Sequence, residues 1–197
     1  MEVGPNQEGA IVVKGPLPPS GFPTVWRDHD RYKEGYWKDF PGFYLTGDGG
    51  YRDEDGYIYV MGRMEDVINV AGHRLSTGQI EQVVAKHAVI AECAVVGIND
   101  KEKGQVPVSL IVLKDGANMT SEALEKELVT MVREAVGPIA NFKRILIVER
   151  LPKTRSGKIL RQVMRKMIDG EEYSVPSTIE DPSVIEELET GIANWKL

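Results

Sequence analysis

The sequence predicts an α+β protein, and two observations support this fold class. Residues 1–63 are rich in Gly, Pro and aromatic residues, and they contain short strand-like stretches bounded by glycine. Residues 64–172 then show, in order, the patterns of a hairpin, a helix, two strands, a helix, a strand and a helix. This alternation without a regular βαβ repeat is typical of an α+β domain. Residues 173–197 form an acidic C-terminal tail.

The N-terminal part is expected to be all-β and irregular. "GAIVVKG" (9–15) and "GYIYVMGR" (56–63) have the composition of strands, and "DEDG" (53–56) forms a hairpin turn before the second. Proline keeps "GPLPPSGFP" (15–23) extended. Because two or three strands alone cannot bury both faces of a sheet, this part is expected to belong to something larger.

The elements of the C-terminal part follow from their hydrophobic periodicity and their end signals. Ser76 or Thr77 caps the first helix, and Thr120 or Ser121 caps the second. Gly137 and Pro138 end the second helix. The expected elements are a hairpin over 66–76, a helix over 76–88, strands over 90–100 and 105–114, a helix over 120–137, a strand over 143–150 and a helix over 159–168. The tail carries a further acidic helical pattern over 183–195, expected to pack on another surface or to be mobile.

Composition excludes several functional classes. No run of about 18 apolar residues is present, so the sequence predicts no membrane span. Cys93 is the only cysteine, which excludes an internal disulfide and fits a reducing compartment. Its apolar neighbours predict a thiol buried in a strand rather than a catalytic nucleophile.

The charge is unevenly distributed. The net charge is −6, yet residues 138–168 contain nine Lys or Arg and a single Glu. This segment includes "LPKTRSGKILR" (151–161), a basic loop with glycine. It is either a solvated helix face or a site for a polyanion such as nucleotide or coenzyme phosphates. Only Phe142 could stack on a base, so nucleic acid is not expected.

Five residues near the middle of the chain are candidates for ligand binding. Asp48 lies between a strand end and a glycine pair, where its carboxylate either accepts hydrogen bonds from ribose hydroxyls or shapes the turn. Arg63 and Arg74 flank the hairpin and either bind phosphate or are surface charges. Gly72 either admits a ligand close to the backbone or supplies a positive φ. His73 has no partner at metal-ligand spacing, so zinc is not expected.

Lys158 follows Gly157 and precedes an apolar helix. A flexible cation beside a helix start suits an anion. The pattern is not a P-loop, because the first Gly and the final hydroxyl of G-x-x-x-x-G-K-[ST] are missing. No Ser-His-Asp or Cys-His order and no specific pair of carboxylates is evident.

Read together, three motifs resemble one family. "YLTGD" (44–48), "GRMEDVINVAGHRLS" (62–76) followed by "IEQVV", and "LPKTRSGKILR" have the order and spacing of the last three core motifs of adenylate-forming (AMP-binding) enzymes. "NVAGHR", "VREAVGPIA", "GPLPPS" and "STIEDPS" resemble the short-chain acyl-CoA synthetases of the acetyl- and propionyl-CoA type. The resemblance covers nearly the whole chain.

The resemblance implies an acid–thiol ligase that uses ATP, coenzyme A and Mg²⁺. Such an enzyme joins a small carboxylate to AMP, releases pyrophosphate and passes the acyl group to coenzyme A. A large N-terminal domain holds most of the site, and a small mobile domain adopts one pose for each half-reaction. Residues 1–63 would be the β-rich end of the large domain. Residues 64–172 would be the mobile domain, with its hinge hairpin and a three-stranded sheet flanked by helices. The expected location is the cytoplasm, or the mitochondrial matrix in a eukaryote.

The resemblance also assigns residues. Asp48 would bind the ribose hydroxyls, Arg63 the nucleotide and Arg74 its phosphate, and Lys158 would be the catalytic adenylation lysine. Acetylation of Lys158 would remove its charge and act as a switch. Glu65 would be the hinge residue, at a position where the family more often has Asp. The remaining assignments are Ala71, Gly72 and Arg133 for coenzyme A, and Ala85, His87 and Ile90 for a divalent metal ion.

The family's Gly- and Ser/Thr-rich phosphate loop and its acyl pocket lie in the N-terminal region, outside these 197 residues. The chain is therefore expected to be the C-terminal portion of a synthetase that works with its N-terminal domain. Two alternatives are a non-catalytic nucleotide- or CoA-binding module and the end of an adenylation domain that loads a carrier protein. "VREAVGP" argues against the second alternative.

Overall fold

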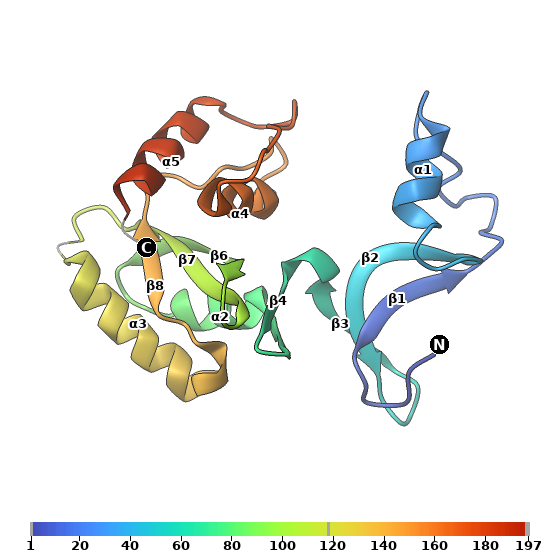
Figure 1. The fold of residues 1–197 in the computed structure, drawn as a ribbon, viewed down its shortest axis with the longest axis horizontal. Helices are drawn as coiled ribbons and strands as arrows, with labels where there is room; N and C mark the ends of the chain where they lie inside the picture. The colour runs from blue at the N-terminus through green and yellow to red at the C-terminus, as the bar shows by residue number, and fades with distance from the viewer. Residues whose placement is uncertain (1, 118, 196–197) are drawn as a thin grey trace. The chain divides into compact units, whose positions relative to one another are not determined.

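The computed structural model describes residues 2–117 and 119–195, with the side chain of Glu65 outside the described part. The chain divides into two compact units, Met1–Glu65 and Asp66–Leu197 (Figure 1). The short 3₁₀ turn η1, Met64–Asp66, contains the boundary between them. No helix in the described ranges is long and apolar enough to cross a bilayer.

The N-terminal unit is built on an antiparallel sheet of three described strands in the order β1-β2-β3 (Figure 1). Its elements are β1 (Gly9–Lys14), α1 (His29–Tyr36), β2 (Phe43–Arg52) and β3 (Ile58–Arg63). The expected strands at 9–15 and 56–63 correspond to β1 and β3. In the register of the second pair, Asp48 lies opposite Arg63.

The expectation that this part is all-β was wrong, because it contains the helix α1. The Asp28 side chain caps this helix by accepting a hydrogen bond from the Arg31 amide at 3.1 Å. The segment is strongly polar and contains Gly35, so it has little helical periodicity. Tyr32 and Tyr36 supply its apolar contacts, and both pack edge-on against Phe22.

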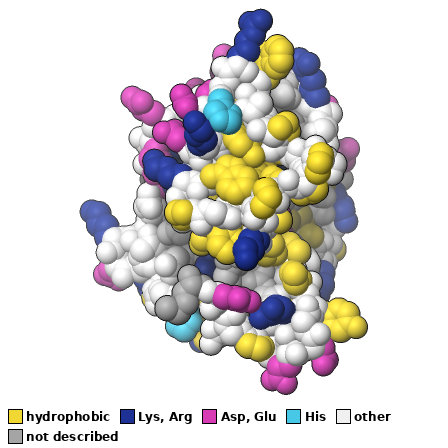
Figure 2. Space-filling view, turned by 90° about the vertical axis from the view of Figure 1, so that its right-hand side faces the viewer, with side chains coloured by type: hydrophobic (Ala, Val, Ile, Leu, Met, Phe, Trp, Pro, Cys, Tyr) yellow, Lys and Arg dark blue, Asp and Glu magenta, His cyan; other side chains and the backbone are white. Residues whose placement is uncertain are grey.

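The N-terminal unit has very little core of its own. Tyr32 is the only buried hydrophobic side chain among its described residues. Hydrophobic side chains gather on the face of the molecule shown in Figure 2. The large hydrophobic residues that this unit exposes are Val3, Val13, Phe22, Trp26, Phe43, Tyr57, Ile58, Tyr59 and Val60. This unit therefore leaves many large apolar side chains in contact with solvent.

The C-terminal unit confirms the α+β class, and the expected hairpin joins the three expected strands in one sheet. Its described strands form one five-stranded sheet in the order β5-β4-β7-β6, with β8 parallel to β7 and the other pairs antiparallel. The strands are β4 (Val67–Val70), β5 (His73–Ser76), β6 (Ile90–Asp100), β7 (Gly104–Leu113) and β8 (Arg144–Ile147). The helices are α2 (Thr77–Val84), α3 (Ser121–Ala135), the 3₁₀ turn η2 (Pro138–Ala140), α4 (Arg161–Asp169) and α5 (Ser183–Asn194).

Helices cover both faces of this sheet, α2 and α3 on one side and α4 and α5 on the other (Figure 1). Alternation along the strands divides the core accordingly. In β7, Ile111 belongs to the cluster under α2 and α3, whereas Val108 and Leu110 belong to the cluster under α4 and α5. Because both sides are covered, β7 is apolar along "VSLIVL" except at Ser109, which is itself fully buried.

The expected hinge hairpin is continuous with the sheet. Val70 of β4 pairs with Gly104 at the start of β7, and the Ala71 amide donates to the Lys103 carbonyl oxygen at 2.8 Å. The Gln105 side chain accepts from the Asn69 amide, also at 2.8 Å. The hairpin is therefore held at one end of the long β6–β7 pair.

The acidic tail is part of the C-terminal unit. Its helix α5 buries Val184, Ile185 and Leu188 in the cluster that also contains Met164 of α4. The second face of the sheet would otherwise be exposed, because α4 is only nine residues long. The tail is thus the second half of the cover over this face.

Leu188→Ala tests this packing, because the Leu188 side chain is 1% exposed. Deleting a fully buried leucine should lower the free energy of unfolding of the C-terminal unit by about 2–5 kcal/mol. Glu186→Ala on the exposed side of α5 is the matched control and should change it by less than about 0.5 kcal/mol. Amide hydrogen exchange of β6 and β7 measures both values. Equal effects of the two substitutions would show that α5 is not part of the core.

Candidate functional site

In the N-terminal unit, Asp48 and Arg63 form an ion pair across neighbouring strands. Nη1 of Arg63 lies 3.3 Å from Oδ1 of Asp48 and donates to the Thr46 carbonyl oxygen at 3.0 Å. The Thr46 hydroxyl donates to the Ile11 carbonyl oxygen and accepts from the Asp48 amide. Both charged side chains remain partly exposed. The arrangement offers a carboxylate and a guanidinium side by side, which suits a ligand with both hydroxyl and anionic groups.

Gly47 makes room for this pair. Its φ is +82°, and a Cβ atom placed on it would lie 2.6 Å from Nη2 of Arg63. Any other residue would both strain the backbone and displace the guanidinium. Glycine at this position of "YLTGD" therefore has a direct steric reason.

In the C-terminal unit, Ala71 and Gly72 form the exposed tip of the β4–β5 hairpin. Val70 pairs with His73, so these two residues are the whole loop, and their φ values are +49° and +88°. Positive φ at both central residues is the type I′ turn that fits the twist of a hairpin. A Cβ atom on Gly72 would meet nothing within 4 Å, so the tip is open. Arg74 follows on β5 and is also exposed.

Lys158 is the last residue of a tight turn that begins at Thr154. The Thr154 amide donates to the Lys158 carbonyl oxygen at 2.8 Å, and the Thr154 hydroxyl accepts from the Lys158 amide at 3.1 Å. The Gly157 amide donates to the Thr154 carbonyl oxygen, and Gly157 has a φ of +81°. The main chain of Lys158 is thus bonded twice to Thr154, while its side chain is exposed.

Several cations around this turn pair with carboxylates, although Arg155 within the turn is exposed. Lys153 pairs with Glu92 of β6 at 2.6 Å, and Arg165 pairs with Asp169 and Glu171. The Lys158 ammonium has no such partner within the described part of the chain. The expectation of a concentrated positive field over 138–168 therefore needs correction, because nearby acidic residues, several of them in the tail, compensate many of its charges.

Arg161 and Glu81 form a largely enclosed pair. Nε and Nη2 of Arg161 donate to the two carboxylate oxygens of Glu81 at 3.0 and 2.9 Å, and the side chains are 23% and 17% exposed. Glu81 also accepts from the Val95 amide of β6 at 2.8 Å. The pair joins α2 to the start of α4 around the edge strand β6, and so it fixes the chain just after the Lys158 turn.

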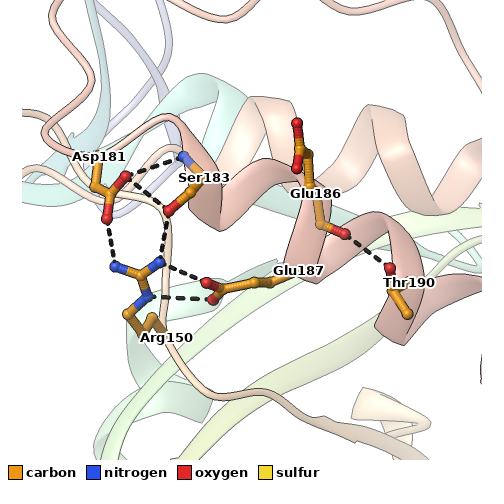
Figure 3. A network of polar contacts seen from close by, with 6 residues as sticks. All are labelled: Arg150, Asp181, Ser183, Glu186, Glu187 and Thr190. Carbon is orange, nitrogen blue, oxygen red and sulfur yellow. Dashed lines mark hydrogen bonds and ion pairs between the residues drawn. The ribbon is translucent and has the colours of Figure 1, made fainter.

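Arg150, a few residues before the Lys158 turn, binds side chains of the C-terminal tail (Figure 3). Its guanidinium contacts Asp181 at 2.6 Å, the Ser183 hydroxyl at 2.9 Å and Glu187 at 2.6 Å. We call Arg150, Asp181, Ser183 and Glu187 the Arg150 clamp. Hydrogen bonds from Arg150 and then from Ser183 lower the pKa of Asp181 from 3.8 to about 2. This stabilising contribution is present above about pH 4 and is lost as the pH falls toward 2.

Cys93 lies in a strand as expected, but its side chain is half-buried rather than fully buried. It lies in β6, and its thiol points to the Glu81 carbonyl oxygen at 3.6 Å. Burial, followed by the negative charge of Glu81, raises the pKa of Cys93 to about 11. The thiol is therefore protonated at neutral pH, which argues against a nucleophile.

Arg133 lies in the last turn of α3 and is exposed. Together with Gly137, Asn141 and Lys143 it lines a shallow pocket of about 240 Å³. The pocket has two cations and a backbone bend, because Gly137 and Asn141 both have positive φ. Sequence reasoning did not identify Lys143 here, since nothing in "NFKRIL" distinguishes it from a surface lysine.

The turn at Ala85, His87 and Ile90 offers little to a divalent ion. The His87 ring lies 2.9 Å from Glu127, and the His87 carbonyl oxygen accepts from the Ile90 amide at 3.1 Å. A lysine ammonium, that of Lys114, already donates to the neighbouring Ala88 carbonyl oxygen at 2.7 Å. Among the described residues no three His, Cys, Asp or Glu side chains group as metal ligands. The metal assignment stays a prediction.

The predicted site residues therefore fall into separate groups. Asp48 and Arg63 meet within the N-terminal unit, whereas Arg74, Arg133 and Lys158 lie on separate elements of the C-terminal unit. Glu65 belongs to η1 at the unit boundary, and its side chain lies outside the described residues. Arg150 and Glu81 were not identified from the sequence, because partners 31 to 80 residues away leave no local signal.

Comparison with known proteins shows what this chain is similar to. Residues 79–158 match the AMP-binding enzyme C-terminal domain. An uncharacterized protein of Pseudomonas aeruginosa is 56% identical over 96% of this chain and 30% of its own length. The mitochondrial acyl-CoA synthetase short-chain family member 3 of Mus musculus is 50% identical over 92% of this chain and 26% of its own.

A solved structure shares the fold. The ATP-bound RpMatB-BxBclM chimera B1 aligns with a TM-score of 0.69 and 28% identity, over 85% of this chain and 32% of the chimera. The chain spans less than a third of the length of the curated relatives it matches.

Gly47→Ala tests the steric reason for glycine beside Arg63. Gly42→Ala is the matched control, because Gly42 has a φ of +86° but nothing within 4 Å of a Cβ atom. Backbone strain of about 1–2 kcal/mol should affect both variants. Gly47→Ala should lower the free energy of unfolding further than Gly42→Ala does, since its Cβ atom must also displace the Arg63 guanidinium. Amide hydrogen exchange of β2 and β3 measures the difference, and equal losses in the two variants would contradict the steric account.

Proposed function

Because this chain contains the C-terminal domain of AMP-binding enzymes, we propose that it is the C-terminal portion of a short-chain acyl-CoA synthetase. The whole enzyme joins a small carboxylate to ATP as an acyl-adenylate and then transfers the acyl group to coenzyme A. The names of the relatives support this proposal, since they include short-chain acyl-CoA synthetases and an acetyl-coenzyme A synthetase. The cytoplasm or the mitochondrial matrix is the location that belongs to this proposal, and two of the relatives are named as mitochondrial.

The Lys158 turn is the observation that carries the proposal. Lys153, Arg150 and Arg161 around it are held by carboxylates, whereas Lys158 presents an unpaired ammonium within the described residues. Negative charge shifts onto the phosphate oxygens as acyl-adenylate forms. A positioned ammonium stabilises that charge in the transition state. A lysine already paired with a carboxylate would lose part of this effect.

The nucleotide would bind with its ribose at Asp48. The carboxylate can accept hydrogen bonds from two hydroxyls while Arg63 keeps it ionised and oriented. Arg63 would also contact the nucleotide, and Arg74 on the exposed side of β5 would reach its phosphate. Asp48 and Arg63 belong to the N-terminal unit, and Arg74 and Lys158 belong to the C-terminal unit.

Coenzyme A would use other surfaces of the C-terminal unit. The open tip formed by Ala71 and Gly72 has the space that a pantetheine chain needs beside the main chain. Arg133 and Lys143 line a pocket whose cations suit a coenzyme A phosphate. Mg²⁺ would accompany ATP. The turn at Ala85, His87 and Ile90 is poorly suited to hold the ion.

The exposed apolar surface of the N-terminal unit supports a further part of the proposal. With Tyr32 as its single buried hydrophobic residue in the described range, this unit would complete its core against the rest of a large N-terminal domain. Glu65, at the boundary of the two units, would then be the hinge about which the C-terminal domain changes pose.

Lys158→Ala in a synthetase that contains this chain tests the proposed role. Acid-dependent pyrophosphate exchange should fall by about 100-fold or more, because a transition-state cation is lost. Transfer of the acyl group from supplied acyl-adenylate to coenzyme A should persist, since Lys158 acts in the first half-reaction. Lys126→Ala, at an exposed position of α3, is the control and should affect neither rate. Comparable losses in both half-reactions would refute the role.

Gly72→Leu should have the opposite effect in the same enzyme. A leucine side chain at the hairpin tip should obstruct the path of coenzyme A and lower acyl-CoA production, while pyrophosphate exchange persists. Gly116→Leu is matched for strain, because both glycines have positive φ and open space around a Cβ atom. If both Leu variants lower acyl-CoA production equally, the tip does not border the coenzyme A path.

A further inference from the structure

The C-terminal tail lines the back of the Lys158 turn. The Arg155 amide donates to the Thr178 carbonyl oxygen at 3.0 Å, and the Glu180 amide donates to the Lys153 carbonyl oxygen at 2.9 Å. Between these two hydrogen bonds, Thr154 and Ile179 form an antiparallel bridge. The Ile179 side chain is 5% exposed and belongs to the core under α4 and α5. The tail is therefore a short strand-like partner for the base of the turn.

The Arg150 clamp holds this partner in place. Thr178–Glu180 pair with the turn, and Asp181 next to them binds Arg150 (Figure 3). Arg150 also binds Glu187, which lies in α5 six residues after Asp181, through two nitrogen–oxygen contacts of 2.6 and 3.2 Å. Arg150 and Lys153 are only three residues apart in the chain. These contacts close a small ring. It consists of the backbone from Arg150 to Lys153, the hydrogen bond between Lys153 and Glu180, and the Arg150 clamp.

The ring is connected to Lys158 through Thr154. Thr154 pairs with Ile179 on the tail side, and it makes the two hydrogen bonds to the Lys158 main chain on the other side. A shift of the tail would therefore move Thr154 and with it the backbone from which the Lys158 side chain extends. The ammonium itself stays mobile, whereas its point of attachment is fixed.

We propose that Arg150 and Asp181 are positioning residues for Lys158, and that the tail acts on adenylate formation through the main chain of the turn. The proposal rests on the proposed function of Lys158. A misplacement of about 1 Å in a reacting group can lower a rate by about 100-fold, so an anchor of this kind matters to the rate as well as to stability. The fork of a guanidinium suits such an anchor, because it binds two carboxylates with fixed geometry.

The first test uses the 197-residue chain and needs no activity. Arg150→Gln should speed hydrogen exchange at the amides of Arg155, Lys158 and Glu180, while exchange in β6 and β7 stays slow. Arg165→Gln is the matched control, because Arg165 also pairs with two carboxylates but contacts neither the turn nor residues 178–181. Unchanged exchange in the turn of Arg150→Gln would overturn the proposal. Asp181→Asn provides the same test if Arg150→Gln does not fold.

The second test measures both half-reactions in a synthetase that contains the chain. Arg150→Gln should lower kcat for acid-dependent pyrophosphate exchange by about 10- to 100-fold, with little change in the KM for ATP. Thioester formation from supplied acyl-adenylate should persist. In a Lys158→Ala background, Arg150→Gln should cause no further loss, since residues that act as a unit are not additive. A full additional loss, or equal losses in both half-reactions, would show a merely structural role.

Lys158→Ala alone separates the two proposals. If it leaves adenylation intact, the proposed function fails and the positioning proposal fails with it. If Lys158→Ala is selective for adenylation but Arg150→Gln is no worse than Arg165→Gln, only the positioning proposal fails.

Discussion

The need to cover both faces of one sheet determines most of the C-terminal unit. Strand β7 lies between β4 and β6, pairs with β8 and sends Ile111 to one face and Leu110 to the other, so neither face can remain in water. Helices α2 and α3 cover the first face. The second face needs both α4 and α5, because one nine-residue helix is too short to cover it. This requirement brings the tail back over the sheet and places residues 178–181 against the turn that leads into α4.

Charge pairing follows from this packing. The acidic tail returns beside the basic segment, where Asp181 and Glu187 bind Arg150, and Glu92 of the edge strand binds Lys153. Exposed pairs of this kind contribute little stability individually. Their effect here is chemical, because they occupy the neighbouring cations and leave Lys158 as the lysine with an open ammonium at the end of the turn. The proposed adenylation chemistry needs such a cation at a fixed backbone position.

The sequence predicted the parts of the fold that have local signals. Thr120 caps α3, as one of the two expected residues, and the strand expected over 105–114 corresponds to β7. The helix α1 was missed because its sequence is strongly polar and contains Gly35. The motifs predicted the candidate site residues, but no motif predicted the Arg150 clamp. Arg150 and Asp181 are 31 residues apart, and nothing in either neighbourhood specifies the other until the tail packs on the sheet.

The proposed role of Lys158 depends most directly on its ammonium being accessible, in contrast to the paired ammonium of Lys153. Both lysines belong to the same turn region, but Lys153 lies 2.6 Å from a carboxylate of Glu92, whereas Lys158 is exposed and has no such partner within the described residues. Limited acylation of the chain with an amine-reactive acetylating reagent, followed by peptide mass spectrometry, compares their rates under one condition. The account predicts that Lys158 reacts at the rate of the exposed Lys126 and that Lys153 reacts more slowly. Reaction of Lys153 as fast as Lys158 would contradict it.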